Sequence, residues 1–141
     1  MPDLTTRRFG RTELPIPLLS LGGMRFQQSW TDLPASEITS DSQANLQATL
    51  QRATQLGLHH VETARHYGSS ERQLGWAFPT TPDPTRILQS KVPPREDPDA
   101  FEAELALSFE RLGCQRLDLL AIHGINLPEH LEQTLRPGGC M

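Results

Sequence analysis

One stretch of the sequence predicts a strand-to-helix loop that carries the residue types of a reaction centre. It reads Glu62-Thr63-Ala64-Arg65-His66-Tyr67-Gly68-Ser69-Ser70-Glu71. The apolar run from His59 to Ala64 has the length of a strand, and a segment of helical period follows the stretch. The loop between them therefore places a carboxylate, Glu62, five residues before a phenol, Tyr67.

Apolar runs of strand length alternate with helical segments along the rest of the chain. Strands are predicted over Leu18 to Met24, His59 to Ala64, Ile87 to Val92 and Leu117 to His123. Helices are predicted through Leu46, Leu50 and Ala53, from Ser70 to Phe78, from Pro98 to Leu112 and from Pro128 to Leu135. This alternation is typical of βαβ units and predicts an α/β fold with a parallel sheet.

Turn and cap residues predict the boundaries of several segments. A Gly10-Arg11-Thr12 turn indicates an N-terminal β-hairpin within Arg7 to Pro15. Ser70 and Gln73 have the spacing of a capping box at the start of the second helix. The segment from Gln27 to Asp41 has no clear period and is predicted to be a long loop, which after a strand is often functional.

The length of the chain limits how this sheet can close. A (β/α)8 barrel needs about 250 residues, whereas the sequence has 141 residues and reads as one domain over 1–141. Four βα units suffice for an open doubly wound sheet, or for the first half of a TIM-type barrel. A half-barrel is expected to expose edge strands and an apolar inner face.

Composition narrows the class of protein. The net charge is -4, and both signs are interspersed, which argues against a nucleic-acid partner. The two cysteines have neither disulfide nor metal spacing, so a reducing compartment is expected. The apolar run from Leu14 to Met24 is broken by prolines and glycines and predicts neither a signal peptide nor a membrane span. We therefore expect a cytoplasmic protein without a membrane partner.

Four polar side chains are predicted to meet at one edge of the sheet. Glu62 and Tyr67 lie at the carboxyl end of the second predicted strand, Lys91 at that of the third and His123 at that of the fourth. The carboxyl edge of a parallel sheet is where α/β proteins build active sites.

These residue types suit acid–base chemistry at a carbonyl group. A free tyrosine has a pKa near ~10, and a neighbouring ammonium is expected to lower it. A carboxylate beside Lys91 would hold the lysine in place and keep it charged, while His123 could orient a carbonyl oxygen. Reduction of a C=O bond fits this set, with hydride supplied from outside the protein.

Structural interpretations of the same residues stay open. Tyr67 can be a packed loop anchor, His123 a hydrogen-bonded core histidine, and Glu62 an ion-pair partner of Arg65 or Arg72. A second alternative is a metal-dependent barrel hydrolase that uses His60, Glu62, Lys91 and His123. The spacing of His59, His60 and His66 nevertheless lacks a typical metal-binding pair, so no metal is expected.

Three stretches resemble the aldo/keto reductases. They are Arg7-Arg8-Phe9-Gly10-Arg11-Thr12-Glu13-Leu14 with Leu21-Gly22-Gly23-Met24, then His60 to Glu71, and then Leu117 to His123. The middle stretch is similar to the family signature Asp-Thr-Ala-x-x-Tyr-Gly-x-Ser-Glu. The resemblance covers nearly the whole chain and implies a (β/α)8 barrel that reduces small-molecule carbonyl substrates with a nicotinamide cofactor, usually NADPH, although NAD is possible.

Carried over position by position, the resemblance implies specific roles. Tyr67 would be the general acid, Lys91 would depress its pKa, and His123 would orient the carbonyl. Glu62 stands where the family usually has aspartate, and one extra methylene changes how its carboxylate reaches Lys91. Gly22, Gly23 and Met24 would lie along the nicotinamide.

Two further expectations follow from the resemblance. Glu62 and the run His123-Gly124-Ile125-Asn126 resemble a branch whose longer members add a C-terminal iron–sulfur segment, which this sequence lacks, so no cluster is expected. The family's remaining strands carry most of the cofactor contacts. An alternative is therefore a non-catalytic half-barrel that self-associates or pairs with a complementary half.

Overall fold

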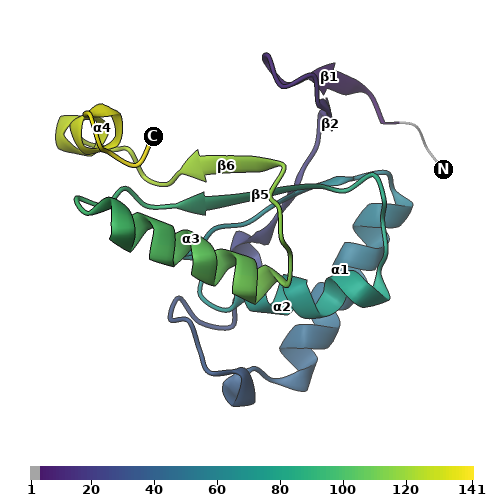
Figure 1. Ribbon diagram of the computed structural model, residues 1–141. Coiled ribbons are helices and arrows are strands. Elements are labelled where there is room, and N and C mark those ends of the chain that lie inside the picture. The colour runs from purple at the N-terminus through teal and green to yellow at the C-terminus, as the bar shows by residue number, and fades with distance from the viewer. Residues whose placement is uncertain (1–3) are drawn as a thin grey trace.

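The computed structural model describes residues 4–141 and contains a four-stranded parallel sheet with three helices against one face (Figure 1). The strands, in sheet order, are β3 (Leu21–Gly22), β4 (His60–Glu62), β5 (Ile87–Val92) and β6 (Leu119–Ile122). The helices between them are α1 (Ser40–Gln55), α2 (Ser70–Ala77) and α3 (Pro98–Leu112). Consecutive parallel strands with their crossover helices on one face form the repeating unit of a (β/α) barrel.

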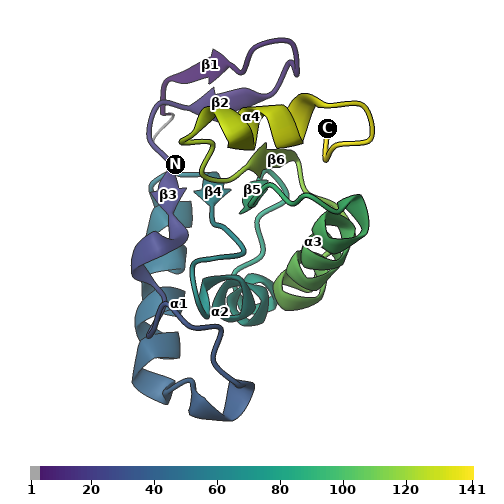
Figure 2. The same ribbon diagram turned by 90° about the vertical axis from the view of Figure 1, so that its left-hand side faces the viewer.

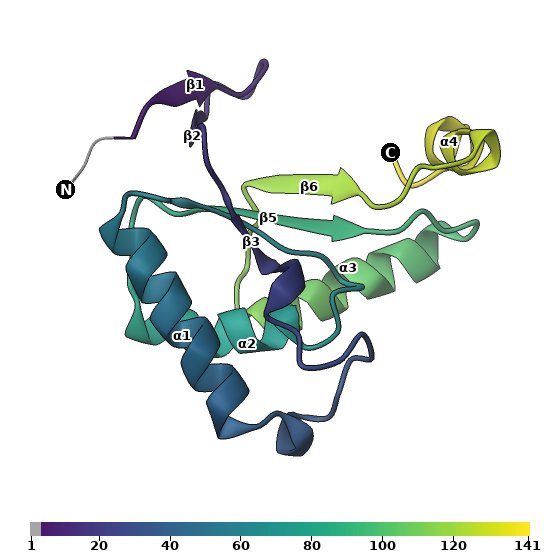
Figure 3. The same ribbon diagram turned by 180° about the vertical axis from the view of Figure 1, so that it is seen from behind.

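Strands β1 and β2 and helix α4 lie on the other side of the sheet (Figure 2). Strands β1 (Thr6–Arg8) and β2 (Pro15–Pro17) pair antiparallel, which confirms the expected hairpin. Helix α4 (Pro128–Leu135) follows β6 and lies beyond the carboxyl ends of β5 and β6 (Figure 3). No helix in the described part of the chain combines the length and the apolar character needed to cross a bilayer.

The hydrophobic core fills the space between the sheet and α1, α2 and α3. Its buried members are Phe26, Leu46, Leu50, Val61, Leu74, Ala77, Leu88 and Leu112. Because side chains alternate along a strand, Val61 of β4 and Leu88 of β5 point to the same, helix-covered face. Burying each such side chain stabilises the fold by about 1.5–3 kcal/mol.

The opposite, inner face of the sheet is mixed, because polar side chains of β4 and β5 share it with Ile87, Leu119 and Ala121. The expected apolar inner face is therefore apolar in part. The His60 ring makes two hydrogen bonds on this face. Its Nδ1 bonds to Ser20 Oγ at 2.7 Å, and its Nε2 bonds to Gln89 Oε1 at 3.1 Å. The parallel register of β4 and β5 places Glu62 beside Gln89 on this face. Polar groups from neighbouring strands thus satisfy one another across the sheet.

Several boundaries differ from the sequence predictions. The first predicted strand shortens to Leu21–Gly22, because the chain turns at once into a 3-10 helix, η1 (Gly23–Arg25). The long loop contains a 3-10 turn, η2 (Ala35–Glu37), and a third, η3 (Phe78–Thr80), follows α2. The capping box at Ser70 is not formed, since the Ser70 hydroxyl donates instead to the carbonyl oxygen of Gly23 at 2.9 Å.

The contact between α2 and α3 generates a stability prediction. A Cβ added at Gly75 would lie 2.3 Å from the carbonyl oxygen of Arg111 and 2.9 Å from the carbonyl carbon of Leu112. We predict that Gly75→Ala lowers the free energy of unfolding by about 1–3 kcal/mol through overpacking, although alanine has the higher helix propensity. Urea unfolding followed by circular dichroism measures the change.

Gly22→Ala is the control, because the nearest atom to its added Cβ is Glu62 Oε2 at 3.8 Å. Equal or greater stability of the Gly75→Ala variant would contradict the close packing of the two helices.

Candidate active site

The loop between β4 and α2 is held by backbone hydrogen bonds on both sides of Tyr67. Beyond β4, the amide of Thr63 donates to Gln89 O and that of Arg65 to Lys91 O, both at 2.9 Å, so the chain stays beside β5. The Tyr67 amide then donates to Ala64 O at 3.0 Å and closes a tight turn. Gly68 follows with φ of +52°, a value that favours glycine.

A buried ion cluster fixes this loop to its surroundings. Arg65 is only 4% exposed, and its guanidinium contacts Glu71 at the start of α2 and Asp32, the latter at 2.5 Å. Ser90 of β5 donates to the second Glu71 carboxylate oxygen at 2.6 Å. Glu104 of α3 lies 3.7 Å from Arg65 Nε. We call these five residues the Arg65 cluster; it joins the loop, α2, β5, α3 and the segment before α1.

The structure brings together the four predicted site residues. The Lys91 ammonium forms an ion pair with the Glu62 carboxylate and donates to Thr63 O at 3.1 Å. The same nitrogen lies 4.6 Å from the centroid of the Tyr67 ring. The His123 ring meets the Tyr67 ring edge to face, with centroids 5.4 Å apart and an interplanar angle of 89°. Glu62 therefore pairs with Lys91, and not with Arg65 or Arg72.

Burial dominates the electrostatics of the site. It lowers the pKa of Lys91 to about 8, and the Glu62 carboxylate acts against it because it stabilises the ammonium. Burial raises the pKa of Tyr67, opposite to the direction expected from a neighbouring ammonium. The ammonium lies against the face of the Tyr67 ring, where it makes a cation–π contact. The pKa of His123 is lowered by burial and then by the charges of Lys91 and His66.

The three residues expected along the nicotinamide differ in their surroundings. Gly22 is exposed, and a Cβ there would meet only Glu62 Oε2 at 3.8 Å. Gly23 is buried, and a Cβ there would lie 2.8 Å from Ser70 Oγ, so its role is close packing against α2. Met24 is half-buried in η1. Gly22 is thus the one of the three with open space beside the Lys91–Glu62 pair.

Two aromatic residues near the site were not among the predicted set. The Trp30 ring, 63% exposed, meets the Tyr67 ring edge-on at 6.5 Å. The His66 ring lies 6.4 Å from that of His123. Trp30 comes from the long loop that was expected to be functional, but the sequence contains no periodicity that would have placed it beside Tyr67. Across residues 4–141, no group of three or more His, Cys, Asp or Glu side chains is placed to hold a metal ion.

We predict a large loss of stability when the Arg65 cluster is broken. Arg65→Met leaves the Glu71 carboxylate, which is 0% exposed, without its cation. We expect the free energy of unfolding to fall by about 3–5 kcal/mol, measured by chemical denaturation. The control is Arg8→Met, which breaks the exposed Arg8–Glu13 pair and is expected to cost less than about 1 kcal/mol. Similar small losses in both variants would contradict the structural role of the cluster.

Lys91 is the only lysine in the sequence, so its ionisation can be followed directly. With [ε-¹³C]lysine labelling, we predict an NMR titration with a pKa of about 8, because burial disfavours the ammonium. Glu62→Gln should lower this pKa further, since the carboxylate that stabilises the charge is removed. A pKa near the ordinary value of 10.5 in the folded protein would contradict the burial. An unchanged pKa in Glu62→Gln would contradict the ion pair.

Comparison with known proteins gives a consistent family. The sequence model of the aldo/keto reductase family matches residues 18–136. A search of curated protein sequences found no match. Among solved structures, a protein of Pseudomonas aeruginosa described as an aldo-keto reductase has 26% identity and a TM-score of 0.72, over 93% of this chain and 53% of its own. An aldo-keto reductase from Klebsiella pneumoniae, solved in complex with NADPH, has 25% identity and a TM-score of 0.63.

The Klebsiella match covers 92% of this chain and 44% of the other. A thermostable aldo-keto reductase solved with the inhibitor epalrestat shares the fold at 24% identity and a TM-score of 0.72, over 93% of this chain and 49% of its own. The chain thus spans about half the length of these structures, which agrees with the expected partial TIM-type barrel. With a family match over most of its residues, the chain belongs to the aldo/keto reductase family.

Proposed function

We propose that the chain takes part in NAD(P)H-dependent reduction of a small-molecule aldehyde or ketone to an alcohol, with Tyr67 as the general acid. The observation that carries this proposal is the meeting of Tyr67, Lys91, Glu62 and His123 at the carboxyl ends of three adjacent strands. This set contains a phenol, an ammonium with its carboxylate partner and an imidazole, which are residue types suited to proton transfer to a carbonyl group.

The roles follow from the geometry. Tyr67, the only tyrosine of the sequence, is a protonated phenol at neutral pH, since the ordinary pKa of tyrosine is ~10 and burial raises it further. It can therefore donate its proton as negative charge develops on the carbonyl oxygen. The Lys91 ammonium, held by Glu62, lies 4.6 Å from the Tyr67 ring and favours the phenolate left after proton transfer. His123, whose lowered pKa keeps it neutral, can donate or accept a hydrogen bond at the carbonyl.

The residues beside this set fit a flat nicotinamide ring in part. Gly22 leaves a surface without a side chain next to the Lys91–Glu62 pair. Gly22 and the neighbouring Met24 are the residues that would contact the ring, whereas Gly23 is filled by its own packing. A nicotinamide supplies the hydride when bound. The extra methylene of Glu62 relative to aspartate does not prevent its contact with Lys91.

A second candidate is a non-catalytic half-barrel that self-associates or pairs with a complementary half. It is favoured by the two strands at the ends of the sheet, β3 and β6, each of which has one neighbour. Unpaired strand edges are templates for association with another chain. Analytical ultracentrifugation distinguishes the candidates: a compact monomer that binds NADPH would count against this one.

The reductase proposal predicts that one substitution lowers turnover without weakening the binding of NADPH. Tyr67→Phe should bind NADPH as the wild type does, measured by cofactor fluorescence, because the substitution keeps the ring and removes only the hydroxyl. Its turnover of an aldehyde panel should fall by at least about 10²-fold, the contribution of a positioned acid. Leu131→Ala, in the exposed face of α4, is the matched control and should keep its rate. If the wild-type chain neither bound NADPH nor turned over any aldehyde of the panel, this would contradict the proposal for this polypeptide.

A further inference from the structure

Residues 28–32 are packed against the turn that carries Tyr67. Gly68, which directly follows Tyr67, is buried, and a Cβ added to it would overlap the carbonyl oxygen of Ser29 and lie 3.1 Å from that of Thr31. The two backbones are therefore in direct contact, with no room for a side chain between them. This contact brings a segment that is distant in sequence to the edge of the candidate active site.

Gln28 anchors the start of this segment. Its backbone amide donates to Ser69 Oγ at 3.3 Å. Its side chain closes the base of the loop, because Oε1 accepts from the Thr39 amide at 2.8 Å and Nε2 donates to Glu37 O at 2.9 Å. Residues 28–39 thus form a compact loop whose two ends are joined.

Asp32 anchors the other end of the segment. Its Oδ2 accepts from Arg65 Nη2 at 2.5 Å and from Arg111 Nε, on α3, at 3.3 Å. Arg65 is buried and precedes Tyr67 by two residues. Within the described part of the chain, Asp32 has the only side chain of residues 29–36 that forms a hydrogen bond or ion pair with another segment.

Trp30 lies between these two anchors. Its ring meets the Tyr67 ring edge-on, with centroids 6.5 Å apart and an interplanar angle of 77°. The indole is 63% exposed, so its own burial contributes little to holding it there. Its place beside the Tyr67 ring depends instead on how the segment is anchored on either side of it.

We propose that Asp32 is a positioning residue of the candidate active site, because its carboxylate holds the segment that sets the Trp30 ring against the Tyr67 phenol. The inference rests on the proposed reductase function, in which Tyr67 donates the proton. A general acid acts efficiently only within about an ångström of its productive position. The Trp30 ring limits the orientations of the phenol and keeps water from part of it. Asp32 acts only through the segment that carries Trp30.

Charge balance at Arg65 is a poorer explanation of Asp32. The guanidinium also contacts Glu71, which is fully buried, and lies 3.7 Å from Glu104. Glu104 belongs to α3, which does not carry Trp30, so it supplies the same charge to the same guanidinium from outside the segment. Glu104 is therefore the matched control. Because Arg65 retains Glu71, the fold is expected to survive the loss of either Asp32 or Glu104.

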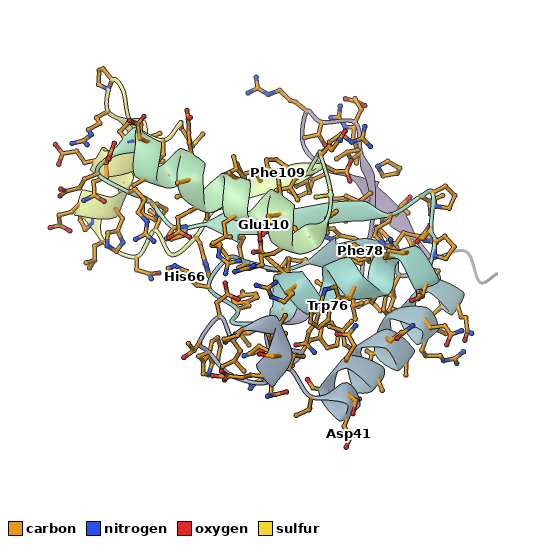
Figure 4. The ribbon with its side chains drawn as sticks, turned by 60° about the horizontal axis from the view of Figure 1, so that its bottom comes forward. Asp41, His66, Trp76, Phe78, Phe109 and Glu110 are labelled. Carbon is orange, nitrogen blue, oxygen red and sulfur yellow. The ribbon has the colours of Figure 1, made fainter. Side chains whose placement is uncertain are left out.

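The test follows the contact between the two aromatic rings directly. In a Trp76→Phe parent, Trp30 is the only tryptophan and Tyr67 the only tyrosine. Trp76 is 43% exposed on α2 and, in Figure 4, is well separated from His66, which directly precedes Tyr67. We expect NMR of this parent to show a nuclear Overhauser effect between the ring protons of Trp30 and Tyr67.

Two variants of this parent separate positioning from charge. The nuclear Overhauser effect should be lost in Asp32→Ala and retained in Glu104→Ala, while circular dichroism checks that both are folded. Asp32→Asn, which keeps the shape of the side chain, should weaken the effect in the same direction. In aldehyde reduction, Asp32→Ala should lower kcat by about tenfold at an unchanged KM for NADPH, since a misplacement of about 1 Å can cost up to about 10²-fold. Glu104→Ala should keep its kcat.

A ring contact that is absent from the parent, persists in Asp32→Ala, or is lost equally in Glu104→Ala would overturn the inference. An unchanged kcat in Asp32→Ala would overturn it as well. The NMR measurement does not need turnover, so it separates this inference from the proposed function. If the expected NMR pattern is found but the parent reduces no aldehyde, the reductase function is refuted, and Asp32 remains the residue that places Trp30 beside Tyr67.

Discussion

The buried ion pair between Arg65 and Glu71 is the interaction on which the candidate site depends. Arg65 precedes Tyr67 by two residues and Glu71 follows it by four, and their opposite charges form an ion pair that is buried from water. Desolvation of such charges is costly unless every polar group has a partner. Here Ser90 supplies a partner for Glu71 and Asp32 one for Arg65, an arrangement that ties the loop to β5 and to the segment before α1. The position of the Tyr67 ring follows from that arrangement.

The loop between β4 and α2 carries residues that contact both sides of the sheet. Arg65 and Glu71 point toward the helices, whereas Glu62, Tyr67 and Lys91 lie toward the inner side of the sheet. Alternation along β5 puts Ser90, the partner of Glu71, and Lys91, the partner of Glu62, on opposite faces of the sheet. Structural charge and candidate catalytic charge are thus adjacent in sequence but act on opposite faces. Glu71 cannot replace Glu62 as the partner of Lys91, since Arg65 and Ser90 already occupy it.

The polar side chains on the inner face of the sheet bear on what this part of a barrel can bind. Ser20, just before β3, forms a hydrogen-bonded row with His60 of β4 and Gln89 of β5, and the Lys91–Glu62 pair lies further along toward the carboxyl edge. Association through this face would bury these polar groups together with the apolar Ile87, Leu119 and Ala121. Association through the open edges of β3 and β6 would instead rest on backbone hydrogen bonds. The carboxyl edge, with its aromatic and charged side chains, is the more selective part of the surface.

Much of this protein could be read from the sequence. The strand-length runs, the helix periods and the hairpin turn were enough to predict a parallel α/β fold, and the strand ends of Glu62, Lys91 and His123 were enough to predict where they meet. Such features are local, or follow from the fixed geometry of a parallel sheet.

The tertiary structure decided the pairings and their energetics. The local sequence pattern does not indicate that Arg65 forms an ion pair with Glu71 while Lys91 forms one with Glu62. These pairings depend on which face of the sheet each side chain occupies. The direction of the Tyr67 pKa shift likewise depends on burial and on the approach of Lys91 to the ring face, which only the packed site defines. The sequence by itself determined the family and the edge of the sheet that carries the site; long-range packing determined the partner of each charge.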